Sequence, residues 1–365
     1  MVTKRGENMN IGILGLPLTG KTTLFNLLTS QHKKMDAFSS RKTKNIGVVK
    51  VADDRVDYLS LIYQPKKIIY ATIEMIDIPG ISPELPDKEK QDVLNQIQNV
   101  DALLMVIRVF NDTVIPGNND PLSQVESLVY EILLRDLEIT ENRINRLNQS
   151  KRKLNRQEEM EKQILEKCHQ HLSNDQLMIT QALTEEELKL LSGFGFFTLK
   201  PVIVALNLDE NQLRTNQFPN REKFNKFLGD HQMASIQICG KLEMEINELN
   251  EEEREIFLED LGFQETGIER LSHILYQHLG LISFFTVGKD EVRAWTIPLG
   301  TTAVKAAGKI HSDIERGFIR AEVVRYTDYK QWESMQKVKE KGLLKVEGKD
   351  TIIEDGDIIN FRFNV

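Results

Sequence analysis

A glycine-rich turn followed by a lysine and two threonines stands near the amino terminus of the chain. Gly15 and Gly20 bracket the turn, and Lys21, Thr22 and Thr23 come directly after it. An apolar run precedes the turn and residues with helical spacing follow it, which is the context of a phosphate-binding loop. The glycines let successive main-chain N–H groups converge on phosphate oxygens, and the start of a helix adds its positive dipole end. The spacing therefore predicts a binding site for a nucleoside triphosphate.

The residues of this loop have separate expected roles. The Lys21 ammonium can reach the β- and γ-phosphates, and the Thr22 hydroxyl can ligate Mg²⁺. Mg²⁺ is therefore the cofactor that the sequence predicts. The residues expected to surround the phosphates are Leu18, Thr19, Gly20, Lys21, Thr22 and Thr23.

A second motif supplies a carboxylate for the same metal ion. The apolar run 73–78 leads into Asp77-Ile-Pro-Gly80, and we expect Asp77 to hold the Mg²⁺ shell and the Gly80 N–H to face the γ-phosphate. Many nucleoside triphosphatases place Gln after this glycine to orient the attacking water, whereas this chain has Ile81. Because an aliphatic side chain cannot hydrogen-bond water, we expect unassisted hydrolysis to be slow. No residue is singled out as catalytic.

A third motif bears on the base of the nucleotide. The apolar run 201–206 is followed by Asn207-Leu208-Asp-Glu210, where guanine-specific nucleotidases carry Asn-Lys-x-Asp. The Asp of that motif accepts hydrogen bonds from N1 and N2 of guanine, whereas adenine presents an acceptor at N1. Glu210 is longer and can turn aside, which leaves main-chain groups near Leu208 to meet the adenine edge. These residues favour ATP, with GTP as an alternative.

The chain as a whole resembles the YchF family, also called the Obg-like ATPases. The carboxy-terminal similarity is the most specific, since 284–298, 306–322 and 355–365 resemble the TGS domain of that family. Residues 238–249 are similar to its segment beside the base pocket, and the resemblance extends over residues 10–365. It implies a ribosome-associated ATPase that hydrolyses slowly and uses its nucleotide as a conformational switch.

Three segments depart from the family pattern. Leu18 stands where the family has Asn, whose amide oxygen can coordinate a monovalent cation. The first switch segment is 38–45, where Thr43 is the candidate threonine that closes over Mg²⁺ and an ungapped alignment gives Arg41 instead. The Gly-rich second switch of the family is replaced by residues 81–90. The chain therefore resembles a divergent branch of the family.

The apolar runs predict a doubly wound α/β core. Parallel strands are expected at 11–16, 73–78, 103–109, 202–206 and 235–239. Helix-length segments separate them, which indicates a P-loop NTPase fold with a Rossmann-like parallel sheet and the phosphate loop at the end of the first strand. The last part of the chain alternates between apolar and polar residues, with helical periodicity only near 328–341, and the resemblance implies a ubiquitin-like β-grasp TGS domain there. The expected domains are a nucleotide-binding domain (9–121 and 198–279), an inserted helical hairpin (122–197) and the TGS domain (280–365).

The predicted hairpin has a basic tip. Apolar residues recur at helical spacing on both sides of a polar segment at 148–150, which predicts two antiparallel helices. Six basic residues and no acidic one occur across the tip: Arg143, Arg146, Lys151, Arg152, Lys153 and Arg156. Such groups bind phosphates with salt-sensitive affinity, and the alternative is an ordinary solvated helix end. The family resemblance favours the ribosome or its RNA as partner, bound through this tip and the TGS domain.

The composition of the chain excludes some kinds of protein. The chain has 365 residues, 40% of them apolar, and a net charge of −8, which excludes nucleic-acid binding by bulk charge alone. It has two cysteines, Cys168 (expected in the core) and Cys239, and its first apolar run, 11–16, is too short for a signal core or a membrane span. We therefore expect a cytoplasmic protein. The competing hypotheses are a guanine-specific GTPase and a nucleotide sensor that binds RNA or the ribosome with little turnover.

Overall fold

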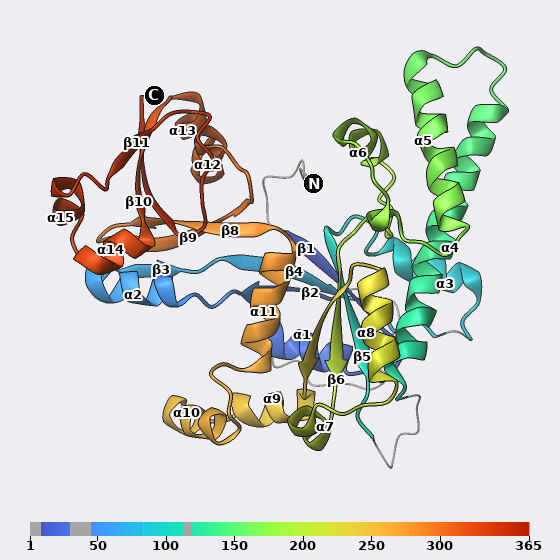
Figure 1. Cartoon of the computed structure of the whole chain (residues 1–365), viewed down its shortest axis with the longest axis horizontal. Helices are drawn as coiled ribbons and strands as arrows, with labels where there is room; N and C mark the ends of the chain where they lie inside the picture. Colours follow the sequence, from blue (N-terminus) through green and yellow to red (C-terminus); the bar gives the residue numbers. More distant parts are fainter. Residues whose placement is uncertain (1–8, 30–44, 83, 112–118, 365) are drawn as a thin grey trace. The chain divides into compact units, whose positions relative to one another are not determined.

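The computed structural model describes residues 9–29, 45–82, 84–111 and 119–364, which fall into two compact units (Figure 1). The first unit contains residues 9–48 and 74–271, as far as they are described. The second contains residues 49–73 and 272–364. Two segments of the chain thus contribute to each unit.

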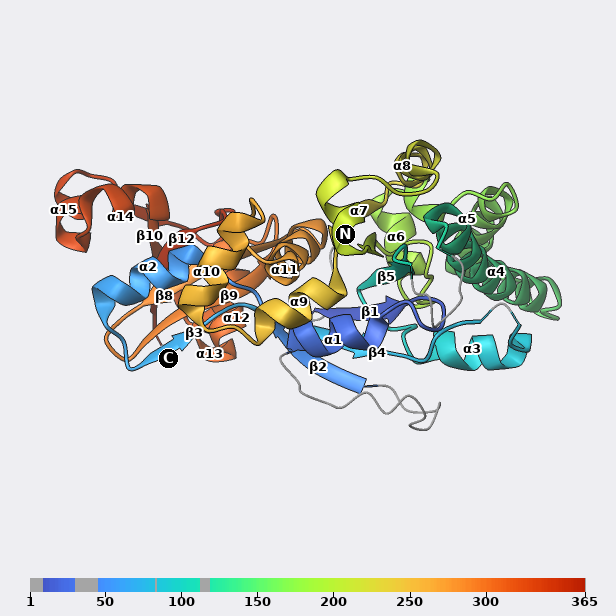
Figure 2. The same ribbon diagram turned by 90° about the horizontal axis from the view of Figure 1, so that it is seen from below.

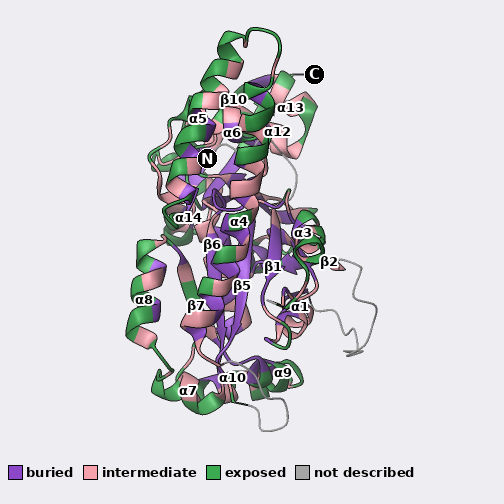
Figure 3. Cartoon of the chain, turned by 90° about the vertical axis from the view of Figure 1, so that its right-hand side faces the viewer, coloured by how far each residue is buried: buried purple, intermediate pink, exposed green. Residues whose placement is uncertain are grey.

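A six-stranded sheet forms the centre of the first unit. Its strands are β1 (Asn10–Leu14), β2 (Asn45–Lys50), β4 (Thr72–Asp77), β5 (Ala102–Arg108), β6 (Val202–Asn207) and β7 (Ala234–Ile238). They lie in the order β2-β4-β1-β5-β6-β7, and β4, β1, β5, β6 and β7 pair in parallel. Every residue of β5 and β6 is buried, as Figure 3 shows in purple, which explains their uninterrupted apolar sequences. All five predicted strands are confirmed; β2 was not predicted.

Helices cover this sheet and extend away from it. They are α1 (Lys21–Thr29), α3 (Asp87–Asn95), α4 (Pro121–Asn148), α5 (Arg156–Leu172), α6 (Glu185–Leu191), α7 (Glu210–Thr215), α8 (Arg221–Asp230), α9 (Gly240–Asn247), α10 (Glu251–Asp260) and α11 (Gly267–His278), with a short 3₁₀ helix at Met178–Thr180. The last of them, α11, continues from the first unit into the second. No helix in the described part of the chain is long and apolar enough to cross a membrane.

Helices α4 and α5 form the predicted hairpin and lie side by side in Figures 1 and 2. Leu133 and Leu147 of α4 pack in one buried cluster with Leu165 and Cys168 of α5. The second helix begins with a capping box, in which the Asn155 side chain accepts from the N–H three residues on. The hairpin therefore has its own apolar core, and Cys168 belongs to it as predicted.

The base of α4 is joined to α3 by polar contacts. The Lys90 ammonium lies 2.7 Å from the Glu131 carboxylate, and both side chains are largely buried. Gln91 donates a 2.8 Å hydrogen bond to Glu138. Since Leu94 is the one fully buried side chain of α3 (Asp87–Asn95), polar groups form much of this interface.

The second unit is built on a mixed sheet. Its strands, in the order β11-β10-β12-β8-β9-β3, are β11 (Lys345–Glu347), β10 (Phe318–Arg325), β12 (Asp357–Phe363), β8 (Leu281–Val287), β9 (Glu291–Pro298) and β3 (Lys67–Ile69). Strands β8 and β9 form an antiparallel hairpin, and β12 lies parallel to β8. Its helices are α2 (Asp54–Tyr63), α12 (Ala303–Ile310), α13 (Ser312–Arg316), α14 (Tyr326–Trp332) and α15 (Met335–Glu340). A mixed sheet with α12 packed on one face is the β-grasp arrangement.

This unit differs from expectation in two respects. Residues 49–73, which include α2 and β3, belong to it, although they lie within the range 9–121 expected of the nucleotide-binding domain. Helices α12 and α13 were not predicted. The buried side of α12 is formed by Ala303, Ala306 and Ala307, whose small side chains give a weak apolar signal in the sequence. The boundaries of the three expected domains stay a prediction.

A buried carboxylate fixes α4 to the segment that leads into β6. Asp136 is fully buried and accepts hydrogen bonds from the Phe197 N–H (3.1 Å), the Thr198 N–H (2.7 Å) and the Thr198 hydroxyl (2.7 Å). Burial raises the pKa of Asp136 to about 6. The carboxylate is therefore the acceptor for two main-chain N–H groups that would otherwise be unpaired.

We expect Asp136→Ala to lower the free energy of unfolding by about 3 kcal/mol, because each unpaired buried N–H costs about 1–3 kcal/mol. Urea unfolding measures this change. Glu141→Ala, on an exposed position of the same helix, is the matched control and should change stability by less than about 0.5 kcal/mol. Equal effects of the two substitutions would contradict the assigned role.

Candidate nucleotide-binding site

The loop between β1 and α1 has a conformation that requires glycine at two positions. A Cβ atom on Gly15 would lie 2.6 Å from the Val106 carbonyl oxygen. Gly20 has a left-handed backbone with φ of 92°, and a Cβ there would lie 2.4 Å from Asn207 Nδ2. Leu18 is also left-handed, with φ of 63°, and its side chain is 61% exposed. A left-handed leucine costs roughly 1–2 kcal/mol, so the loop holds this residue in a strained conformation.

Lys21 is the first residue of α1 and its ammonium group is buried under the loop. Its Nζ donates a 2.8 Å hydrogen bond to the Leu16 carbonyl. The backbone of Gly80 lies close to the loop and to the lysine, because a Cβ on Gly80 would lie 3.0 Å from Lys21 Nζ and 2.8 Å from the Pro17 nitrogen. Burial lowers the pKa of Lys21 to about 8, against the opposing effect of the Asp77 carboxylate. The structure thus brings Lys21, Gly80 and the loop together.

Thr22 and Asp77 form an oxygen-rich corner beside the lysine. The Thr22 hydroxyl donates to Asp77 Oδ2 at 3.1 Å, and the Asp77 side chain is buried, which raises its pKa. The other carboxylate oxygen, Oδ1, has no hydrogen-bond partner among the described residues. A hydroxyl beside a carboxylate oxygen that is buried and unpartnered suits Mg²⁺, which takes one or two carboxylates and completes its shell with phosphates and water. Thr43 lies outside the described residues.

The described residues contain few other groups of metal ligands. Among the residues that the structure describes, no group of three or more His, Cys, Asp or Glu could hold a metal ion. A structural Zn²⁺ or Ca²⁺ cage of that kind is therefore not found in them, whereas a Mg²⁺ site that relies on phosphate oxygens needs no such cage.

Asn207, at the end of β6, connects two other segments, the loop between β1 and α1 and the start of α9. Its Nδ2 donates to the Thr19 carbonyl at 3.1 Å, and its Oδ1 accepts from the Gly240 N–H at 3.0 Å. The side chain is 6% exposed. Gly240 begins α9 directly after β7, and the role of its N–H was not predicted. The resemblance at 238–249 was the signal that could have indicated it.

The side chain of Leu208 is buried, whereas that of Glu210 is exposed. The Leu208 side chain is buried and its N–H donates to the Ile238 carbonyl at 2.8 Å. Glu210 is the first residue of α7, and its carboxylate lies 3.0 Å from the Arg214 guanidinium at an exposed position. The structure therefore places Leu208 with Asn207, whereas it directs the Glu210 carboxylate to a neighbour on its own helix. Thr23 lies in the first turn of α1.

The residue at the water-orienting position is part of the core. Ile81 is 1% exposed and belongs to the apolar cluster under the sheet. Its N–H donates to the Gly15 carbonyl at 3.1 Å. Both the side chain and the main-chain N–H of Ile81 are thus committed to the fold.

The basic tip of the hairpin is partly neutralised. Arg143 pairs with Glu161, and Arg152 pairs with Glu158. These acidic residues lie on α5 but reach back to the tip. The remaining tip cations are exposed and have no ion pair among the described residues: Arg146, Lys151, Lys153 and Arg156.

Comparison with known proteins decides the family. One family profile, the carboxy-terminal domain of YchF GTPases (described as a protein of unknown function), matches residues 281–364, and a second, described as "50S ribosome-binding GTPase", matches residues 10–143. "Ribosome-binding ATPase YchF" of Bacillus subtilis is 37% identical and covers 98% of this chain and 100% of its own. The protein of the same name from Buchnera aphidicola is 39% identical, over 97% and 99% of the two chains. The chain belongs to the YchF family.

The YchF fold has also been determined in a solved structure. "Structure of the Schizosaccharomyces pombe YchF GTPase" aligns with a TM-score of 0.86 at 27% identity and covers 99% of this chain and 100% of that one. The mixed carboxy-terminal sheet, the helical insert and the parallel nucleotide-binding sheet are therefore YchF features. The Bacillus subtilis relative is named an ATPase and the Schizosaccharomyces pombe protein a GTPase, so the residues beside Asn207 bear on the base that this YchF chain binds.

We expect the affinity for ATP–Mg²⁺ to weaken as the pH rises above about 8, the pKa of Lys21 in the free protein. Phosphate anions raise the pKa of the bound lysine, so binding takes up a proton at higher pH, and the affinity falls by up to about tenfold per pH unit. Calorimetric titration in buffers of different ionisation enthalpy measures both effects. In Lys21→Arg the guanidinium stays charged, so any residual binding should show neither effect. A pH-independent affinity of the wild type would contradict this prediction.

Proposed function

We propose that this YchF chain binds ATP–Mg²⁺ in the loop at residues 15–22, hydrolyses it slowly, and binds the ribosome in a manner that depends on the nucleotide. The observation that carries the proposal is the convergence of Lys21, the Thr22–Asp77 pair and Asn207 on one loop at the carboxyl ends of parallel strands. Relatives named "Ribosome-binding ATPase YchF", at 37–39% identity over nearly the whole chain, support it.

The choice of ATP is argued from the main chain at Leu208. Its N–H is used by the Ile238 carbonyl, which leaves the Leu208 carbonyl as the main-chain group beside Asn207. A carbonyl accepts from the N6 amino group of adenine and repels the O6 acceptor of guanine. Glu210, at the position of the guanine-reading Asp, is paired with Arg214. Both features favour adenine over guanine.

The magnesium ion is proposed to be held by the Thr22 hydroxyl and by Asp77, directly or through water, with Thr43 as a further candidate ligand. When bound, it neutralises charge on the phosphate oxygens. Lys21 supplies a second positive charge, and the main-chain N–H groups of Leu18, Thr19 and Gly20 supply fixed donors. Gly80 is proposed to direct its N–H at the γ-phosphate, because it lies against the loop.

Slow turnover follows from the residue at position 81. The Ile81 side chain is buried in the core, so no side chain there can orient the attacking water. Loss of one such group typically costs about 2.7–4 kcal/mol of barrier, which is about 10²–10³ in rate. Hydrolysis is therefore proposed to depend on a group from elsewhere, supplied when the protein is bound to the ribosome.

The ribosome is proposed to be contacted by the hairpin tip and the TGS domain. Four exposed basic residues at the tip lack acidic partners among the described residues: Arg146, Lys151, Lys153 and Arg156. Phosphate groups of RNA are the ligands that such a cluster fits. We further propose that the protein acts in the cytoplasm, because both cysteines, Cys168 and Cys239, are buried free thiols.

Calorimetric titration with ATP and GTP, with and without Mg²⁺, tests the nucleotide part of the proposal. We expect ATP–Mg²⁺ to bind at least about tenfold more tightly than GTP–Mg²⁺, a difference of ~1.4 kcal/mol. Asn207→Ala should weaken ATP binding by more than about tenfold, because it removes the hydrogen bonds to Thr19 and Gly240. Asn211 is an exposed asparagine on α7, and Asn211→Ala should leave the ATP affinity unchanged. A GTP preference above tenfold would favour the guanine-specific alternative.

Co-sedimentation with ribosomes tests the tip. The double variant Lys151→Ala/Lys153→Ala should bind ribosomes several-fold more weakly and with a shallower salt dependence, because two phosphate contacts are lost. Lys223→Ala/Lys226→Ala removes the same charge from exposed positions of α8 and is the matched control. Both variants should bind ATP as the wild type does. Equal ribosome binding by the two variants would exclude this tip as the contact. In a separate single-turnover assay, fast ATP hydrolysis by the isolated protein would exclude the proposed slow switch.

A further inference from the structure

The second unit contains a segment whose lysines are not neutralised. Residues 330–345 include five lysines and two glutamates, which give a net charge of +3 in a chain whose net charge is −8. The segment runs from the end of α14 through α15 to the first residue of β11, and α14 and α15 lie side by side in Figures 1 and 2. All five lysines, which we call the lysine surface, are exposed and none makes an ion pair with a described residue: Lys330, Lys337, Lys339, Lys341 and Lys345.

The two glutamates of the segment are bound by neutral groups. Glu333 accepts a 3.1 Å hydrogen bond from the Tyr58 hydroxyl, and Glu340 accepts one of 2.9 Å from Gln336 Nε2. Neither carboxylate forms an ion pair with a described lysine or arginine. The positive charges of the lysine surface therefore remain available to a partner.

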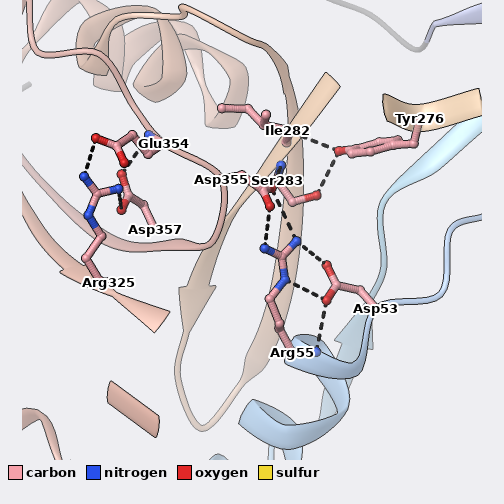
Figure 4. A network of polar contacts seen from close by, with 9 residues as sticks. All are labelled: Asp53, Arg55, Tyr276, Ile282, Ser283, Arg325, Glu354, Asp355 and Asp357. Atoms are coloured by element: carbon pink, nitrogen blue, oxygen red, sulfur yellow. Dashed lines mark hydrogen bonds and ion pairs between the residues drawn. The ribbon is translucent and has the colours of Figure 1, made fainter. Parts of the chain in front are cut away.

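Arginines of the same unit are used differently, as Figure 4 shows. The Arg55 guanidinium donates to Asp53 at 2.9 Å and to Asp355 at 2.6 Å. Arg325 is likewise held by two carboxylates, one of which is Asp357 at 3.0 Å. Ion pairs within the unit thus account for these guanidinium groups, whereas no such pair accounts for the lysines.

Aromatic rings hold two of the lysines without neutralising them. Lys341 Nζ lies 4.9 Å from the centroid of the Trp332 ring, and Lys330 Nζ lies 5.6 Å from that of Tyr58. A ring face attracts an ammonium group but leaves it its full charge. Lys337 stands four positions before Lys341 at the end of α15, so the two side chains are neighbours on the same side of the helix. Ammonium groups that are already held in place lose less conformational freedom when an anion binds.

We propose that the lysine surface binds the phosphate backbone of single-stranded RNA. An RNA strand carries a negative charge at every nucleotide, so several ammonium groups can bind one strand at once. The lysines are spread over α14, α15 and β11, and a continuous strand can follow that spread better than a single acidic side chain can. Lysine lacks the planar fork of arginine, and phosphate contacts carry no sequence information, so the binding is independent of sequence. This inference rests on the proposed function and specifies which part of the carboxy-terminal domain contacts ribosomal RNA.

Fluorescence anisotropy of a labelled single-stranded RNA, titrated with the full chain at several salt concentrations, tests this proposal. Lys337→Ala/Lys341→Ala should weaken RNA binding several-fold. It should also make the slope of log K against log salt shallower by about 1.4, because two phosphate contacts are lost at about 0.7 each. The same pair is also made in the Lys151→Ala/Lys153→Ala background, so that RNA held by the hairpin tip does not mask the effect. Trp332→Leu keeps every lysine and should weaken binding with little change of slope, whereas Trp332→Phe should restore it.

Lys66→Ala/Lys305→Ala is the matched control. It removes the same charge from two exposed lysines of the second unit that are already paired, with Asp290 at 2.8 Å and with Glu315 at 2.6 Å. It should leave the affinity for RNA and the salt slope unchanged.

Equal salt slopes of the wild type and the lysine-surface variant, in both backgrounds, would overturn the inference. Binding of labelled polyglutamate as tight as that of RNA would also overturn it, because the surface would then fit an acidic protein. Failure of the wild type to co-sediment with ribosomes would overturn the proposed function instead, and the RNA titrations would still decide the role of the lysines.

Discussion

The loop between β1 and α1 is held in place by the carboxamide of one asparagine. Asn207 joins the phosphate loop to the loop after β7 through one donated and one accepted hydrogen bond, and it does so from the end of a fully buried strand. An amide is suited to this role because it donates and accepts at once. The left-handed Gly20 next to it lets the loop approach without a clash. Three segments that are distant in sequence are thereby joined.

Local sequence was sufficient to predict the parts of the fold whose physical cause is local. All five predicted strands exist. The two central ones, β5 and β6, read as continuous apolar runs because a parallel strand covered on both faces is apolar throughout. The hairpin followed from helical periodicity, and its core contains Cys168 as expected. The loop at residues 15–22 followed from glycines whose positions admit no side chain.

Other features depend on contacts between distant segments, and sequence patterns carry no signal for these. Strand β3 is three residues long and pairs with β9, more than two hundred positions later, so its sheet could not be inferred. The basic tip looked uniformly positive because its acidic partners, Glu158 and Glu161, lie beyond it on the returning helix. The length of Glu210 predicted that its carboxylate can turn aside from the base, but not that Arg214, one turn along α7, would pair with it.

The length of α4 determines how far its end moves when the helix rotates. A helix of 28 residues is about 42 Å long, so it amplifies a rotation at its origin. Tilting it by roughly 5° sweeps the far end through about 4 Å, more than the length of a hydrogen bond. The Lys90–Glu131 pair lies in the third turn of α4, where Leu128 and Ile132 also pack into the apolar cluster of the first unit. A small rotation of α4 at its buried amino-terminal end would thus be magnified into a displacement of the hairpin tip large enough to make or break a polar contact.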